Sequence, residues 1–126
     1  MEEVIKKFKF RDKGTVLNAP ADMKEAFAQF GFQTDLDKNG LSKNTLVFVY
    51  QREALQHFLN NELKYIEPDS VLWLAYPKGS SKVMTDINRD SFRQTGETFG
   101  ITTVTAVSIN DTWSALRFRP IDSVGK

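Results

Sequence analysis

The sequence contains no cysteine among its 126 residues. This absence excludes structural disulfides, thiolate metal sites and cysteine nucleophiles. It also fits a cytoplasmic protein, because disulfides are rare in that compartment. His57 is the only histidine, so a zinc site would need several carboxylates, and a histidine-based catalytic triad is possible only around this residue.

Charge of one sign and long hydrophobic runs are also missing. The chain has 17 Lys and Arg against 16 Asp and Glu, a net charge of +1, so electrostatics favour neither nucleic acid nor an acidic membrane as partner. The longest apolar run, residues 71–76, is too short to cross a bilayer. The first residues lack the pattern of a signal peptide. We expect a single cytoplasmic domain over residues 1–126.

Hydrophobic periodicity predicts six strands and three helices. Met23, Ala26, Phe27 and Phe30 mark the first helix, Leu55, Phe58, Leu59 and Leu63 the second, and Phe92, Thr95, Gly96 and Phe99 the third. The predicted strands are residues 15–18, 32–36, 45–50, 71–76, 101–109 and 113–119. Before them, the basic stretch 6–13 carries Phe8 and Phe10, which we expect to pack inward while the lysines stay solvated.

This order of elements predicts the fold class. Helices between strands imply right-handed crossovers and a parallel sheet, and the continuously apolar strand 71–76 suits a sheet covered on both faces. The three-residue turn 110–112 predicts that the last two strands form an antiparallel hairpin. We therefore expect an α/β fold, a three-layer Rossmann-like sandwich with a mostly parallel sheet of about six strands and an antiparallel C-terminal hairpin.

Such an arrangement resembles a truncated class I methyltransferase fold. Residues 16–20, 72–78 and 111–120 also resemble stretches of a family of small uncharacterised bacterial proteins with a domain of unknown function. That resemblance implies the fold and brings no established activity. The glycine-rich turn of methyltransferases is replaced here by Asn18-Ala19-Pro20, in which proline lacks an N–H donor and no glycine eases the approach of a cofactor.

The loop after strand 71–76 is the first candidate site. It follows the carboxyl end of a strand, where open α/β sheets place ligands, and its lysines and hydroxyls suit a phosphate or carboxylate. If the last strand runs antiparallel, Asp111 and Trp113 flank the same crevice as Asn18, with Trp113 stacking on a ligand. The alternatives are a solvated loop, a turn aspartate and a packed tryptophan. The expected ligand residues are Asn18, Lys78, Ser80, Ser81, Lys82, Asp111 and Trp113.

Three further patterns have structural alternatives. Arg117 and Arg119 share one strand face and suit anions, but Arg119 would lie away from the ligand edge, where we expect ion pairs with acidic residues or a partner subunit. The role of Arg117 stays open. Residues 35–40 match half of a calcium loop, whose twelfth position is Leu46 instead of glutamate; a polar turn with positive φ at Asn39-Gly40 is the alternative.

We therefore expect an α/β domain without catalytic function that binds a small anionic ligand or a protein partner at the carboxyl edge of the sheet. One alternative is a reduced methyltransferase-like enzyme that uses S-adenosylmethionine at that edge. Another is a structural homo-oligomer that buries an aromatic face. The sequence identifies no cofactor.

Overall fold

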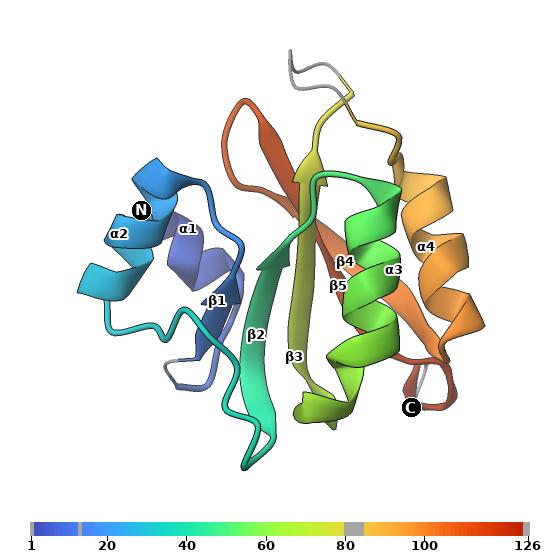
Figure 1. The fold of residues 1–126 in the computed structure, drawn as a ribbon. Coiled ribbons are helices and arrows are strands. Elements are labelled where there is room, and N and C mark those ends of the chain that lie inside the picture. Colours follow the sequence, from blue (N-terminus) through green and yellow to red (C-terminus); the bar gives the residue numbers. More distant parts are fainter. Residues whose placement is uncertain (1, 13, 80–84, 125–126) are drawn as a thin grey trace.

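The computed structural model describes residues 2–12, 14–79 and 85–124 (Figure 1). Its elements follow in the order α1 (Glu2–Lys7), β1 (Thr15–Leu17), α2 (Ala21–Gln29), β2 (Ser42–Phe48), α3 (Arg52–Asn61), η1 (Leu63–Tyr65), β3 (Ile66–Pro77), α4 (Arg89–Thr98), β4 (Ile101–Ser108), β5 (Trp113–Pro120) and η2 (Ile121–Ser123). None of the described helices is both long and apolar enough to span a membrane.

The five strands form one sheet in the order β1-β2-β3-β5-β4. β1, β2 and β3 pair in parallel. β5 lies between β3 and β4 and runs antiparallel to both, so the expected antiparallel pairing of the last two strands is confirmed. Because β5 inserts into the sheet instead of extending its edge, it makes two of the four strand pairings antiparallel.

The fold class expected from the sequence is wrong. The described sheet has five strands instead of about six, half of its pairings are antiparallel, and four α-helices accompany it. This is a mixed α/β domain and not a three-layer Rossmann-like sandwich with a mostly parallel sheet. The likeness to a truncated methyltransferase fold, which rested on that topology, is corrected with it.

The missing strand is residues 32–36. Only Gln33 pairs with β1, through Val16 N–H to Gln33 O at 2.8 Å and Gln33 N–H to Gly14 O at 2.9 Å. Phe32 is buried, and it packs against Phe27 with their rings edge to face at 5.6 Å. Phe32 therefore packs in the core, while Gln33 makes the segment's one backbone bridge to the sheet.

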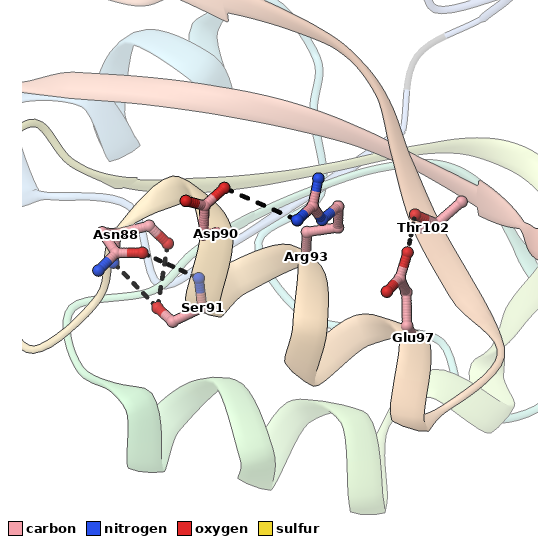
Figure 2. A network of polar contacts seen from close by, with 6 residues as sticks. All are labelled: Asn88, Asp90, Ser91, Arg93, Glu97 and Thr102. Atoms are coloured by element: carbon pink, nitrogen blue, oxygen red, sulfur yellow. Dashed lines mark hydrogen bonds and ion pairs between the residues drawn. The ribbon is translucent and has the colours of Figure 1, made fainter.

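Three of the four α-helices, α2, α3 and α4, lie where the sequence predicts helices, whereas α1 was not predicted. Pro20 precedes α2, and Gly31 follows it with a φ of +89°, a conformation that glycine adopts without steric cost. α4 begins at a capping box, in which the Asn88 side chain accepts from Ser91 N–H and the Ser91 hydroxyl accepts from Asn88 N–H. Figure 2 shows this cap and, at the other end of α4, Glu97 accepting a hydrogen bond from Thr102 of β4.

Two apolar clusters cover the two faces of the sheet. Side chains alternate along a strand, so Leu72, Leu74 and Tyr76 of β3 belong to one cluster and Val71, Trp73 and Ala75 to the other. α3 and α4 pack on the first face and lie in front of the sheet in Figure 1. Residues from α2 and the N-terminal segment complete the second cluster.

The N-terminal segment packs as predicted. Phe8 is fully buried and its ring meets Trp73 edge to face at 5.4 Å. The Trp73 indole N–H donates to the Phe8 carbonyl at 2.9 Å. Phe10 is partly buried beside them, whereas Lys9 is exposed. This segment is therefore a structural part of the second cluster.

Phe8→Ala should lower the free energy of unfolding by about 3–5 kcal/mol, the usual cost of deleting a fully buried phenylalanine side chain. Urea denaturation measures the change. Phe30→Ala is the matched control, because Phe30 is 38% exposed, and it should cost well under half as much. Equal losses in the two variants would show that the N-terminal segment is not part of the core.

Candidate functional site

The carboxyl edge of the parallel strands brings Lys78 and the 110–112 turn together. Pro77 is paired with Trp113, and Lys78 N–H donates to Thr112 O at 2.7 Å. The turn itself is held by Asn110, whose side-chain oxygen accepts from Thr112 N–H and Trp113 N–H. The expected neighbourhood exists, but the Lys78 ammonium already donates to the Ser108 hydroxyl at 2.7 Å.

The Trp113 side chain is buried in the core and is not accessible to a ligand. It is only 4% exposed, and its ring meets Phe48 and Tyr50 edge to face at 5.1 and 4.9 Å. Burial, and then the negative charge of Asp22, raises the pKa of Tyr50, so this phenol stays neutral at physiological pH. Asp111 is exposed in the turn. The aromatic group thus serves the core and leaves little ring surface for a ligand.

Asn18, a further predicted ligand residue, lies in a different hollow. Asn18 has a φ of +60° and lies beside a hollow of about 370 Å³ that it shares with Asp35, Lys38 and Glu62; that hollow includes neither Lys78 nor Trp113. Ser80, Ser81 and Lys82 lie outside the described residues. Among the described residues of the predicted set, Lys78, Asp111 and Trp113 therefore come together, and Asn18 does not share a cavity with them.

The metal and triad patterns also find structural explanations. Among residues 2–12, 14–79 and 85–124, no group of three or more His, Asp or Glu side chains is placed to hold a metal. Asp37 instead accepts a hydrogen bond from Asn39 N–H at 2.9 Å, a typical polar turn. The positive φ expected at Asn39-Gly40 is wrong. His57 is exposed on α3, with Nε2 4.0 Å from Glu62.

The opposite edge of the sheet, at the amino ends of the parallel strands, carries a different arrangement. β2 pairs with β3 at Ser42↔Ile66 and again at Asn44↔Val71. The single residue Lys43 therefore faces four residues of β3, 67–70, which bulge out of the ladder. Asp69 within the bulge has a φ of +56°, a left-handed conformation that is uncommon for residues other than glycine. Bulges often re-aim side chains beside functional sites.

Arg119 holds this bulge in place. Its Nε and Nη2 donate to the two Asp69 carboxylate oxygens at 2.8 and 3.0 Å, the bidentate geometry that suits arginine and carboxylate. The Arg119 hydrogen bond lowers the pKa of Asp69, and the charges of Arg119, Arg117 and Arg11 lower it further against the raising effect of burial. The expected ion pairing of Arg119 with an acidic residue is confirmed.

Arg117 lines a cavity of about 180 Å³ behind the bulge. Its Nε is buried and has no hydrogen-bond partner among the described residues, and the same is true of the Ser70 hydroxyl. Its backbone is fixed by the pairing with Trp73. The cavity is lined by Arg11, Asp12, Lys43, Asn44, Glu67, Asp69, Ser70, Val71 and Arg117. We call it the Arg117 cavity.

The N-terminal segment closes one side of this cavity. Arg11 N–H donates to the side-chain oxygen of Asn44 at 3.0 Å. A Cβ on Gly14 would stand 1.9 Å from the Asn44 carbonyl oxygen, so only glycine lets the chain pass so close to β2. These two contacts bring Arg11 and Lys43, which are 32 positions apart in sequence, to one cavity wall.

Sequence reasoning missed this site for a clear reason. It left the role of Arg117 open and assigned no role to Arg11 or Lys43, because these residues come from three distant segments. The local signals were the basic character of residues 6–13 and the presence of Arg117 and Arg119 on one strand face. Comparison with known proteins adds nothing further, since no family model and no curated protein matches the chain.

An apolar hollow of about 250 Å³ lies beside residues 67–70 as well. Apolar side chains dominate its lining, among them Leu63, Leu72, Phe99 and Phe118, which belong to the cluster under α3 and α4 or pack against it. This hollow is concave, but it has few polar groups that could fix the orientation of a ligand. The Arg117 cavity is therefore the better candidate for specific recognition.

Asp69→Asn tests the ion pair without disturbing the backbone, because asparagine also tolerates the left-handed conformation. The lowered pKa means that the Asp69 charge stabilises the folded state above about pH 4 and that this contribution disappears as the pH falls through the folded-state pKa. We expect the variant to melt a few degrees below the wild type at neutral pH, and the difference in Tm to shrink as the pH falls below about 4. A gap that widens on acidification would contradict the assignment.

Proposed function

We propose that this chain is a binding domain for a small anion, a carboxylate or phosphate group, which the Arg117 cavity holds. This moves the anion site expected from the sequence from the carboxyl edge of the sheet to the opposite edge. The observation that carries the proposal is Arg117, which lines a cavity beside the bulge and whose buried Nε has no hydrogen-bond partner among the described residues.

The geometry of Arg117 favours an external partner. Only its Nε is both buried and unpaired, so its terminal nitrogens remain the accessible part of a guanidinium whose stem is held by the sheet. Guanidinium groups recognise carboxylates and phosphates through two parallel N–H donors. An arginine held in this way loses little conformational entropy when an anion binds.

The charge balance of the cavity supports the same ligand class. Three basic and three acidic residues line it. The Asp69 carboxylate is already paired with Arg119, and Asp12 is not free either. With Arg119 counted, four basic residues stand against three acidic ones, a net charge of +1 that favours an incoming anion.

Thermal-shift and calorimetric titrations with inorganic phosphate, small carboxylates, phosphosugars, nucleotides and S-adenosylmethionine test this proposal. A ligand at a hundred times its dissociation constant should stabilise the folded chain by about 2.7 kcal/mol, which raises Tm by of order 10 °C in a domain of this size. Arg117→Met keeps the apolar stem and removes the charge, so it should abolish the shift.

Arg93→Met is the matched control, because Arg93 lies on α4 and its side chain is 46% exposed. It should keep the wild-type response. A panel in which no compound raises Tm, or a shift that survives in Arg117→Met, would overturn the proposal. A shift that is lost only in Lys78→Ala would return the site to the carboxyl edge.

A further inference from the structure

The two edges of the sheet differ in how they are protected. β1 is three residues long and buried throughout, and Gln33 takes up backbone groups on both sides of Thr15. β4 is eight residues long, and Val104, Thr105 and Ala106 are exposed in succession. In the part of the chain that the structure describes, β4 pairs with β5 alone. One edge is therefore closed and the other open.

The composition of β4 makes this open edge unusual. Its sequence, ITTVTAVS, contains no charged residue and no proline. Natural sheet edges are usually protected by lysine, proline, short length, a β-bulge or a covering segment. β4 carries one of these devices, a bulge at Val104 between the Thr103 and Thr105 registers. The segment after this bulge, residues 105–108, is a regular and uncharged strand.

The hairpin shows which backbone groups of β4 point outward. Ile109 N–H donates to Trp113 O and closes the hairpin. Hydrogen-bonded pairs alternate along an antiparallel ladder, so Val107 and Thr105 direct their backbone groups toward β5. Ala106 and Ser108 therefore direct theirs away from the sheet. Ser108 O already accepts from the Lys7 ammonium at 3.2 Å, which leaves Ala106 as the fully available position.

We propose that β4 pairs with β4 of a second copy of the chain, antiparallel, about a two-fold axis at Ala106. Each Ala106 then donates its N–H to the carbonyl of its mate. Thr105 lies opposite Val107 of the partner subunit, and Val104 lies opposite Ser108 of the partner subunit. The two sheets become one continuous sheet with closed outer edges.

Charge is what favours a second copy as the occupant. A two-fold axis repeats every contact, so a charged strand would place like charges near each other across the axis or require opposite charges at matched positions. β4 carries neither. Cross-strand pairs of threonine and β-branched residues are favourable, and small Ala106 at the axis permits close approach. Two exposed polar groups flank the strand on α4: Figure 2 shows Glu97 bound to Thr102, and Arg93 is directed to Asp90 at 3.8 Å.

Sedimentation analysis over a wide concentration range tests the proposal. The wild-type chain should reach twice its mass of 14.4 kDa at high concentration. Ala106→Pro removes the outward N–H, and proline is tolerated on edge strands where that group faces solvent. Two hydrogen bonds per dimer are lost at about 1 kcal/mol each, so the dissociation constant should rise at least roughly thirtyfold. Circular dichroism and thermal melting show whether the monomer fold is kept.

Val104→Lys is a second variant that needs no change in backbone chemistry, because Val104 is 37% exposed. It should also produce monomers, since lysine is a common protector of sheet edges. Lys24→Ala on α2, far from β4 in sequence and exposed, should leave the dimer unchanged. A wild-type chain that stays monomeric at every concentration would overturn the proposal. So would a dimer that persists in folded Ala106→Pro and Val104→Lys.

Discussion

The antiparallel pairing of β5 with β3 is the constraint on which the rest of this structure depends. It runs from Leu72↔Phe118 to Pro77↔Trp113 and places the last strand of the chain beside the central one. β4 is thereby displaced to the edge of the sheet. The same pairing sets Arg117 beside Trp73, above the opening made by the bulge in β3. The open edge and the Arg117 cavity are both consequences of one strand insertion.

The bulge of residues 67–70 shows how the fold keeps polar groups near its core. A buried donor without a partner costs about 1–3 kcal/mol, and the Arg117 Nε and Ser70 hydroxyl both have this character among the described residues. Asp69 adopts an unfavoured φ in the same place. Such costs persist where surrounding packing holds them. Here the bidentate ion pair of Arg119 fixes Asp69, and the strand pairing with Trp73 fixes the backbone of Arg117.

Local signals in the sequence predict the parts of the fold that depend on local chemistry. The turn at 110–112 indicates the hairpin because Asn110 accepts two backbone N–H groups there. Helical spacing identifies Met23 and Phe27 as buried, and both are. The strand expected at 32–36 failed because Phe32 packs in the core while only Gln33 meets the sheet. Apolar alternation over so short a segment does not separate a strand from a packed loop.

Features that depend on contacts between distant segments could not be predicted from local sequence patterns. β3 begins at Ile66, five residues before its apolar run, and Pro68 and Asp69 concealed that extension because both residue types are depleted in strands. The neighbourhood of Arg11, Lys43 and Arg117 depends on this bulge and on the close approach of Gly14 to Asn44. The order in which β4 and β5 enter the sheet is likewise set by tertiary packing. The sequence therefore predicted an anion site at the carboxyl edge, whereas the site that we propose from the structure lies at the opposite edge.

The two proposals share β5 and yet are physically separable. Arg117 is paired with Thr105, and in the proposed dimer three strand spacings of about 4.8 Å separate the two copies of β5. With the offset of two residues along the strands, the two Arg117 backbones are about 16 Å apart. That exceeds the Debye length of about 8 Å at physiological ionic strength, so their mutual repulsion is largely screened. Anion binding in one cavity therefore neither requires the dimer nor opposes it. Ligand titration tests the anion site, and sedimentation tests the dimer independently.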